Sequence, residues 1–217
     1  MHTLTELERH DMPFGRPQAL FVDGDTLWLS SLATKRIYSM DKLTLRITSE
    51  TPVPEDLFAW GLTKVADEVY VLVGGEGGAD DIRTIRRLRP GIGFDTHYKL
   101  VCPDESGSHL SFDGQSLNLS QWYPRKIIAL DGAGRAGRVL SAQHGICGHC
   151  FAEGAFWALS TDEEKEGDYW LTRIDPARGE NRDLARIGFP CRALAFDGGS
   201  FWTNHRAAGQ LVRLAAP

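Results

Sequence analysis

One pattern of apolar and polar positions recurs five times along this 217-residue chain. Each copy has an apolar strand, a tight turn that usually pairs an acidic residue with glycine, and a second apolar strand that usually carries an aromatic residue. The copies start at Leu20, Leu62, Leu110, Cys150 and Leu194, at steps of 42, 48, 40 and 44 residues, and the step from the last copy round the chain to the first is 43. Short strands at this period are typical of a β-propeller, and a closed ring explains why the last step matches the others.

Each unit is predicted to contain four antiparallel strands, A to D. The A and B strands form hairpins, because an Asp-Gly turn between alternating hydrophobic residues favours a tight reversal. The predicted C strands cover residues 36–41, 84–89, 126–131, 169–175 and 210–214. The predicted D strands cover residues 44–48, 97–101, 137–140 and 182–187. The predicted B–C loops of the second to fifth units cover residues 74–81, 120–125, 161–168 and 203–206.

The fifth unit ends after its C strand, so its D strand must come from elsewhere. We expect residues 3–8 to supply it, because this pairing locks the ring and covers an open sheet edge. The predicted fold is therefore an all-β, five-bladed β-propeller with four strands per blade, in one domain over residues 1–217. The expected blades cover about 16–56, 57–103, 104–143, 144–188, and 189–217 together with 1–12.

The composition argues against several classes of protein. The net charge is −5 and the isoelectric point is near 5.8, so no basic surface indicates nucleic acid or an anionic membrane as a partner. No apolar run approaches the roughly 20 residues that span a bilayer, and the first residues are too polar for a signal segment. Four cysteines are too few for a disulfide scaffold. We expect a soluble, cytoplasmic protein with reduced thiols.

Large aromatic residues recur at one position of the B strand. They are Trp28, Tyr70, Trp157 and Trp202, with Asn118 in their place in the third unit. Recurrence at a single repeat position favours packing between neighbouring blades over stacking on a ligand, since large aromatic side chains dominate the energetics of protein cores.

The repeat also predicts where a binding site lies. The first residue of each copy is here called its anchor. In a propeller, the loop that enters strand A and the loop that joins B to C open on the same face around the central channel. Residues just before the anchors should therefore converge. The predicted ligand-binding residues are Gln18, Trp60, Cys147 and Arg192 before the anchors, and Gln121, Trp122 and His205 in the B–C loops. Arg192 suits a carboxylate or phosphate, and Trp60 suits a planar or sugar ring. His109 and His149 are the candidate catalytic acid and base, because imidazole titrates near neutral pH.

The segment 144–150 concentrates histidine and cysteine. Its Cys-Gly-His-Cys sequence imitates a thiol redox motif, but residues three apart on a strand face opposite sides, so Cys147 and Cys150 should not pair. A zinc site is one alternative, with ligands from adjacent blades: Cys147, His149, His109 and Cys191. The other is that the histidines line a polar channel and the thiols fill small gaps in the core. No cofactor is predicted apart from this zinc alternative.

The units resemble a broad superfamily of β-propellers. Their pattern, Phe-Asp-Gly-x-x-Leu/Phe-Trp followed by Arg/Lys-Ile-x-x-x-Asp, is similar to that of gluconolactonases, streptogramin lyases and glutaminyl cyclotransferases. Plant- and bacterial-type glutaminyl cyclotransferases are five-bladed, and Phe58-Ala-Trp-Gly-Leu62 looks like the Phe-x-Gln-Gly-Leu with which that family begins a blade. Phe151-Ala-Glu-Gly154 is similar to its Phe-Gly-Glu-Gly, although the repeat places Glu153 in a hairpin turn. The resemblance implies a fold.

Three functions stay open. The first is the binding of a small molecule or a peptide at the mouth of the central channel. The second is an enzyme of the glutaminyl cyclotransferase or lyase type that uses the channel histidines. The third is a platform for a protein partner, a role that leaves little trace in the sequence of a propeller.

Overall fold

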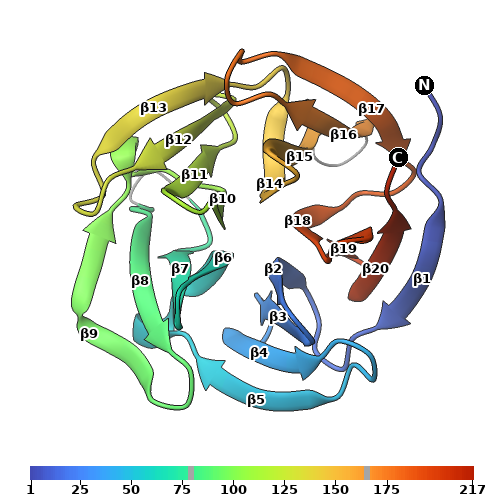
Figure 1. Cartoon of the computed structure of the whole chain (residues 1–217). Helices are drawn as coiled ribbons and strands as arrows, with labels where there is room; N and C mark the ends of the chain where they lie inside the picture. The colour runs from blue at the N-terminus through green and yellow to red at the C-terminus, as the bar shows by residue number, and fades with distance from the viewer. Residues whose placement is uncertain (78–80, 164–166) are drawn as a thin grey trace.

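Five four-stranded antiparallel sheets form a ring in the computed structural model of the chain (Figure 1). The structure describes residues 1–77, 81–163 and 167–217. The predicted all-β, five-bladed propeller is confirmed. Residues 78–80 and 164–166, which belong to the predicted B–C loops of the second and fourth units, lie outside the described residues.

The strands of each blade follow one another outwards from the axis. The first blade contains β2 (Pro17–Asp23), β3 (Thr26–Ser31), β4 (Arg36–Asp41) and β5 (Ile47–Pro52). The second contains β6 (Phe58–Val65), β7 (Glu68–Gly74), β8 (Thr84–Arg89) and β9 (Gly93–Val101). The third contains β10 (His109–Phe112), β11 (Leu117–Gln121), β12 (Lys126–Leu130) and β13 (Ala136–Ser141). The fourth contains β14 (Gly145–Ala152), β15 (Ala155–Thr161), β16 (Tyr169–Ile174) and β17 (Asn181–Ile187). The fifth contains β18 (Arg192–Phe196), β19 (Ser200–His205), β20 (Gln210–Ala215) and, outermost, β1 (Glu6–Asp11).

The C strands match their predicted ranges to within a residue, but two D strands do not. Strand β9 begins earlier than predicted, and β5 begins at Ile47 instead of residue 44. The Asp41 carboxylate accepts hydrogen bonds from the backbone N–H and the hydroxyl of Thr44, both at 2.7 Å. Leu45 then adopts a positive φ of 56°. These local contacts keep the chain in a turn before β5 can pair.

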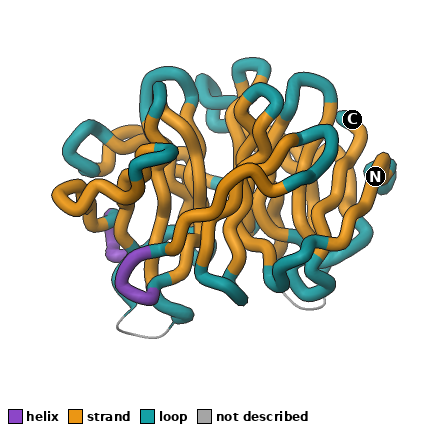
Figure 2. Tube along the Cα trace, turned by 90° about the horizontal axis from the view of Figure 1, so that it is seen from below, coloured by secondary structure: helices purple, strands orange, loops and turns teal. Residues whose placement is uncertain are grey.

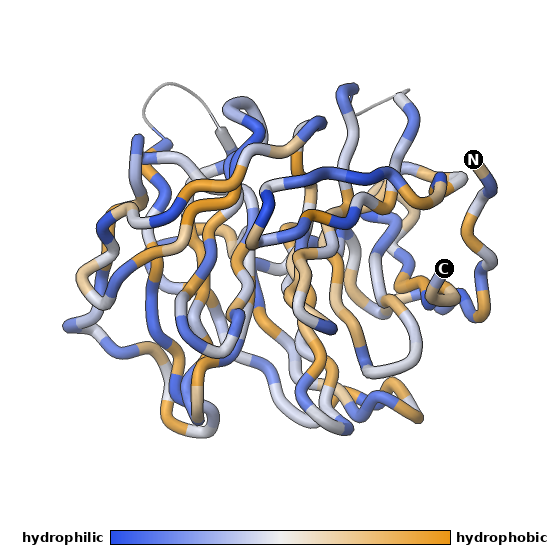
Figure 3. Tube along the Cα trace, turned by 45° about the horizontal axis from the view of Figure 1, so that its top comes forward, coloured by the Kyte–Doolittle hydropathy of each residue, from blue (hydrophilic) through white to orange (hydrophobic). Residues whose placement is uncertain are grey.

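Apolar side chains pack in clusters that lie between neighbouring blades. Trp28 of the first blade packs with Leu62 of the second, and Trp157 of the fourth lies 5.1 Å from the Phe201 ring of the fifth. Trp202 belongs to the cluster between the fifth and first blades. The predicted packing role of these aromatic residues is confirmed. Figure 3 shows hydrophobic and hydrophilic residues alternating along strands, with hydrophilic stretches in the loops.

The strands run between two ends of the ring, and the loops gather at those ends (Figure 2). Two short 3-10 helices, η1 (Pro54–Asp56) and η2 (Pro103–Glu105), lie at one end and lead into the second and third blades. This end, which also carries the B–C loops, is named the mouth face. The opposite end carries the A–B turns and is named the turn face. Within the described ranges, no helix is long and apolar enough to cross a membrane.

Strand β1 closes the ring by pairing with β20. Glu6 lies opposite Leu214 and Asp11 lies opposite Gln210, in an antiparallel ladder. The predicted closure of the last blade by the N-terminus is confirmed, but the strand runs from Glu6 to Asp11 and not over residues 3–8. The preceding residues contact β17 of the fourth blade instead.

Residues before β1 attach the N-terminus to a second blade. The Leu4 N–H donates to the Arg186 carbonyl at 2.8 Å, and the Arg186 N–H donates to the His2 carbonyl at 2.9 Å. The Leu4 side chain is buried in the cluster between the fourth and fifth blades. The first eleven residues therefore hold two blades together, which the repeat pattern does not reveal.

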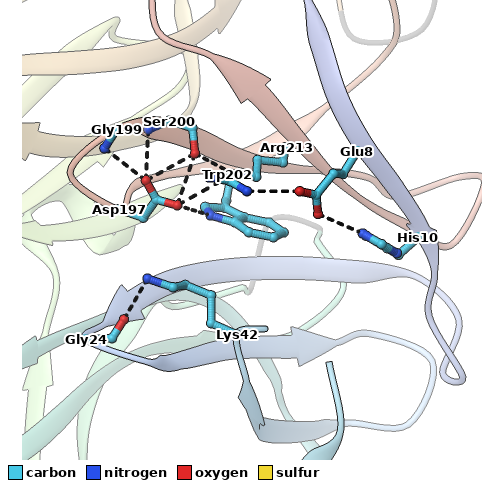
Figure 4. A network of polar contacts seen from close by, with 9 residues as sticks. All are labelled: Glu8, His10, Gly24, Lys42, Asp197, Gly199, Ser200, Trp202 and Arg213. Carbon is cyan, nitrogen blue, oxygen red and sulfur yellow. Dashed lines mark hydrogen bonds and ion pairs between the residues drawn. The ribbon is translucent and has the colours of Figure 1, made fainter. Parts of the chain in front are cut away.

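Side chains also connect β1 to the body of the fifth blade (Figure 4). Glu8 accepts a hydrogen bond from Arg213 Nη1 at 2.9 Å, and Arg213 Nε donates to Ser200 Oγ at 2.7 Å. The Asp197 carboxylate accepts from the Ser200 N–H and from Trp202 Nε1, both at 2.8 Å. An exposed ion pair contributes only about 0–1 kcal/mol, so backbone pairing and apolar burial carry most of the closure.

Deleting residues 1–12 is expected to lower the melting temperature by about 10 °C or more, because it exposes the edge of β20 and uncovers the apolar surface beneath Leu4. Differential scanning calorimetry measures the change. Glu8→Gln in the full chain, which removes the exposed carboxylate that contacts Arg213 and His10, is the control and should shift the melting temperature by only about 1–3 °C. A truncated protein with the same melting temperature as the full chain would contradict closure by β1.

Candidate functional site

The strand pairing changes the repeat alignment of the fourth blade by one residue. In the first two blades the anchor leucine pairs with the residue after the aromatic: Leu20 with Leu29 and Leu62 with Val71. In the fourth blade Ala158 follows the aromatic, and it pairs with His149. His149 is therefore the anchor of that blade, and Cys150 is not. The prediction that the fourth copy starts at Cys150 is therefore wrong, and His109, one residue before the anchor Leu110, does not occupy the same repeat position as His149.

With this alignment, one residue from every blade lines a single cavity at the mouth face. The residues two positions before the anchors are Gln18, Trp60, Ser108, Cys147 and Arg192. All of them line a cavity of about 1000 Å³, here named the mouth cavity. Four of the five A strands carry a β-bulge at or beside this position. A bulge re-aims a side chain, which explains how a buried strand turns one residue toward the axis.

Arg192 places a buried guanidinium at this cavity. Its Nη1 donates to the Tyr169 hydroxyl at 2.9 Å and to the Cys191 carbonyl at 2.8 Å, and it lies 3.6 Å from Cys147 Sγ. Burial raises the pKa of Tyr169, while the hydrogen bond and positive charge of Arg192 oppose that rise. Tyr169 therefore stays a neutral partner that orients the guanidinium. A fixed guanidinium in a cavity is suited to a carboxylate or a phosphate.

Trp60 forms an aromatic wall with Arg83 stacked against it. The Arg83 Cζ atom lies 4.1 Å from the Trp60 ring centroid, and Trp60 Nε1 donates to the Gly75 carbonyl at 3.0 Å. Arg83 Nη2 pairs with Asp81 at 2.7 Å. Burial lowers the pKa of Arg83, and the Asp81 charge opposes this. Arg83 is not among the site residues predicted from the sequence, although its place at the end of a long B–C loop is a usable signal.

Further polar groups complete the cavity wall. Gln18 Oε1 accepts a hydrogen bond from Arg206 Nη1 at 2.9 Å, and both residues line the cavity. Trp122 also lines it and meets Tyr123 edge to face, with ring centroids 4.8 Å apart. Tyr123 is 86% exposed and lies on the rim. The mouth cavity thus combines aromatic surface, the Gln18 amide and side chains of both charges. The charged lining residues are Arg16, Arg83, Arg192 and Arg206 together with Glu76, Asp81, Asp104 and Glu105.

Two predicted ligand-binding residues do not line this cavity. Gln121 is fully buried, and its Nε2 donates to the Pro103 carbonyl at 2.7 Å and to the Ser106 carbonyl at 3.1 Å. These hydrogen bonds from Gln121 hold the loop around η2 in place. His205 is half-buried on the other side of its strand, with its ring 5.6 Å from that of Phe189. Burial lowers the pKa of His205, and the positive charge of Arg9 adds to this effect.

His109 and His149 line a different cavity, at the turn face. Its volume is about 340 Å³, and it is here named the turn cavity. The two rings meet edge to face with centroids 5.6 Å apart, and each residue is 1% exposed. All four ring nitrogens are themselves buried and out of reach of solvent. Burial lowers the pKa of His109 to about 4, and burial together with the neighbouring His109 lowers that of His149 well below its usual value.

The four predicted zinc ligands do not come together. The bulge in β14 falls at Cys147 and breaks the alternation that would place Cys147 and His149 on one face. Cys147 lines the mouth cavity, whereas His149 and Cys150 line the turn cavity. In the part of the chain that the structure describes, no three histidine, cysteine or carboxylate side chains are placed to hold a metal ion. Cys147 and Cys150 form no disulfide with each other and lie on separate cavities.

Solved structures of known propellers share this fold. Glutaminyl cyclase from Myxococcus xanthus has a TM-score of 0.72 at 14% identity, covering 98% of this chain and 97% of that one. Regucalcin, a calcium-binding protein from Agrobacterium tumefaciens, has a TM-score of 0.62 at 13% identity, covering 99% and 95%. Virginiamycin B lyase from Staphylococcus aureus has a TM-score of 0.59 at 12% identity, covering 97% and 99%.

These neighbours belong to the groups that the repeat pattern resembles. No model of a protein family matches the sequence, and no curated protein matches it. At such low identity the similarity shows the fold alone. Glu153, with a φ of 51°, sits in the β14–β15 turn at the end of the ring away from the mouth, as the repeat predicted.

Glycine is required at two places where the inner strands of neighbouring blades approach each other closely. A Cβ at Gly148 would lie 2.3 Å from Ala193 Cα, and one at Gly61 would lie 2.8 Å from Leu110 N. Gly148→Ala is therefore expected to lower the free energy of unfolding by about 1–3 kcal/mol or more, because the fourth and fifth blades must separate. Urea denaturation measures the loss. Gly132→Ala, where a Cβ meets nothing within 4 Å, is the matched control. Equal stability of the two variants would contradict the close approach.

Stability is expected to fall as the pH falls from 7 to 5. The pKa of His109 is about 4 in the folded protein, and an unfolded imidazole titrates near 6.5. The unfolded chain therefore binds more protons in this range, and the free energy of unfolding decreases through it. His109 alone accounts for about 2 kcal/mol between pH 7 and 5.

Urea denaturation at the two pH values measures this change. The double variant His109→Ala, His149→Leu takes the residue types found at these positions in other blades, and it should lose most of the pH dependence. The same pH dependence in both proteins would contradict burial of neutral imidazoles.

Proposed function

We propose that the mouth cavity binds a small molecule or a peptide that carries a carboxylate and a planar group. The supporting observation is convergence: every blade contributes one side chain, from the same repeat position, to one cavity of about 1000 Å³. Binding pockets of this size and mixed composition are typical of ligand sites. The anchors that follow these positions are apolar in four of the five blades, as expected of a scaffold that carries a site.

Arg192 is the group proposed to hold the carboxylate. It is the charged member of the five converging residues, and its guanidinium is held by Tyr169 and by the Cys191 carbonyl. Because that orientation is already fixed, a bound anion costs little further side-chain entropy. Trp60 is proposed to hold the planar group, with Trp122 on the same cavity wall.

The geometry of the mouth cavity favours ligand binding over acid–base catalysis by histidine. No histidine is found among the described residues that line the mouth cavity, and the two candidate catalytic histidines lie on the turn cavity. An enzyme of the cyclotransferase or lyase type would need a different acid or base at the mouth. Glutaminyl cyclase and virginiamycin B lyase are among the structural neighbours, so such an activity is the alternative proposal.

A cytoplasmic location forms part of the same proposal. None of the four cysteines, all of which the structure describes, forms a disulfide. Unpaired cysteines are usual in a reducing compartment.

Isothermal titration calorimetry with two probes tests the proposed site. N-acetylphenylalanine and its amide share the ring and differ only in the carboxylate. The acid is expected to bind about tenfold more tightly than the amide, since one charge-assisted pair contributes about 1.5 kcal/mol or more. Arg192→Gln should remove this preference, and Trp60→Leu should weaken both probes.

Arg36→Gln, which changes an exposed arginine on the outer part of the first blade, is the control and should leave both affinities unchanged. If Arg192→Gln does not fold, the comparison of acid with amide on the parent protein still decides. Equal affinity of the parent for the two probes, or no binding of either, would contradict the proposal.

A further inference from the structure

A third cavity lies between the first and second blades and is here named the interblade cavity. Its volume is about 450 Å³. Strands β2 to β5 of the first blade supply most of its lining residues, and Lys64 and Asp67 come from the second blade. Thr48 and Ser49 on its outer wall are exposed, so a ligand can enter from solvent.

Comparison of the blades explains how this cavity arises. In the second, fourth and fifth blades, the C strand places an arginine directly opposite the aromatic residue of the B strand. These arginines are Arg87, Arg173 and Arg213. The third blade has neither residue type there, since Ala129 lies opposite Asn118. In the first blade Ser39 lies opposite Trp28. Among these five described pairs, only that of the first blade combines the aromatic ring with a small residue in place of arginine.

The fifth blade shows which group occupies the same space when arginine is present (Figure 4). The Arg213 Cζ atom lies 5.6 Å from the Trp202 ring centroid, within the range of a cation–π interaction. Arg213 Nε lies 3.8 Å from Asp197 Oδ2 and donates to Ser200 Oγ at 2.7 Å. Its Nη1 donates to Glu8 at 2.9 Å. An indole, a hydroxyl and carboxylates therefore surround one guanidinium.

The first blade keeps most of these surrounding groups. Trp28, Asp23 and Thr26 stand at the repeat positions of the indole, the carboxylate and the hydroxyl around Arg213, and all three line the interblade cavity. Ser49, which pairs with Ser39 on the outermost strand, also lines it. The cavity is thus lined by the kinds of group that hold a guanidinium in the fifth blade, and its own C strand supplies a serine.

The charges of the lining residues also favour a cation. Lys64 Nζ pairs with Asp23 Oδ2 at 2.5 Å. Asp67 lines the cavity as well, and it forms no ion pair with any residue that the structure describes. Carboxylates therefore outnumber ammonium groups in the lining, and the Asp67 charge is left for a ligand.

We propose that the interblade cavity binds a guanidinium group, such as that of an arginine side chain, stacked on Trp28 and hydrogen-bonded to the carboxylates and hydroxyls around it. A guanidinium is planar and weakly hydrated, stacks on aromatic faces and donates five hydrogen bonds in one plane. An anion is a poorer match, because the lining carries an excess of negative charge. This inference does not depend on the function proposed for the mouth cavity.

Isothermal titration calorimetry at low ionic strength tests the proposal on the full chain, with N-acetylarginine amide and N-acetylcitrulline amide as probes. The two probes have nearly the same shape, but citrulline carries a neutral urea in place of the guanidinium. The arginine probe is expected to bind at least about tenfold more tightly, because charge-assisted hydrogen bonds and the cation–π contact are lost with the charge.

Methylguanidine, which has no peptide groups, distinguishes two sources of the cation. Weaker binding of methylguanidine than of the arginine probe would support the site and assign it to arginine in a peptide. Equal affinity would support the site and assign it to a small guanidine.

Two variants locate the binding. Ser39→Arg supplies the side chain that three other blades carry at this position, so it is expected to fold, to occupy the cavity itself and to abolish binding of the arginine probe. Asp67→Asn should weaken that probe by about twofold or more. Glu180→Gln, which removes an equal charge from an exposed turn of the fourth blade, is the matched control and should leave the affinity unchanged.

Trp60→Leu at the mouth should also leave the affinity for the arginine probe unchanged, which separates this site from the mouth cavity. Three results would overturn the proposal: no binding of the arginine probe, equal affinities for the arginine and citrulline probes, or binding that survives Ser39→Arg. If Ser39→Arg does not fold, the comparison of Asp67→Asn with Glu180→Gln decides, and equal affinities of these two variants for the arginine probe would overturn the proposal.

Discussion

The pairing of β1 with β20 is the interaction on which the rest of this structure depends. The inner strands approach one another so closely at the axis that Gly61 and Gly148 face a neighbour's backbone. Such packing leaves no room for a gap between blades, and the ring must stay closed to keep it. The ladder from Glu6 to Asp11 makes that joint, and the contact of Leu4 with the fourth blade extends it. Both cavities on the axis exist only because the ring is complete.

The same inner strands explain why the channel has two unlike ends. Bulges near the start of the A strands turn Gln18, Trp60, Cys147 and Arg192 toward the mouth. Beyond the bulges the strands run regularly, and they bring the anchors to the turn face. Four of the five anchors there are leucine, and the third and fourth blades each place an imidazole at that end. A larger cavity lined by charged and aromatic side chains and a smaller cavity lined by two histidines thus occupy opposite ends of one scaffold.

The sequence was sufficient for the fold because the hydrophobic period and the Asp-Gly turns both report backbone geometry directly. The C strands and the closure of the last blade were predicted for that reason. The site was predicted only in part, since its placement depends on features with no strong sequence signal. A bulge adds one residue to a strand without changing its composition, and it separated Cys147 from His149. In the fourth hairpin, Cys150 and Trp157 are separated by one residue fewer than the leucine anchor and the aromatic position are in each of the other hairpins. That shortfall was visible, and it marks His149 as the anchor. Arg83 and Arg206 come from loops whose conformation depends on tertiary contacts.

Amide hydrogen exchange across the whole chain tests ring closure most directly. If β1 is an integral strand of the last blade, its hydrogen-bonded amides exchange only through global unfolding, at the same rate as those of the inner strands β2 and β18. Amides of β1 that exchange by orders of magnitude faster, while the inner strands stay protected, would show that the ring holds without its N-terminal strand and would contradict this account.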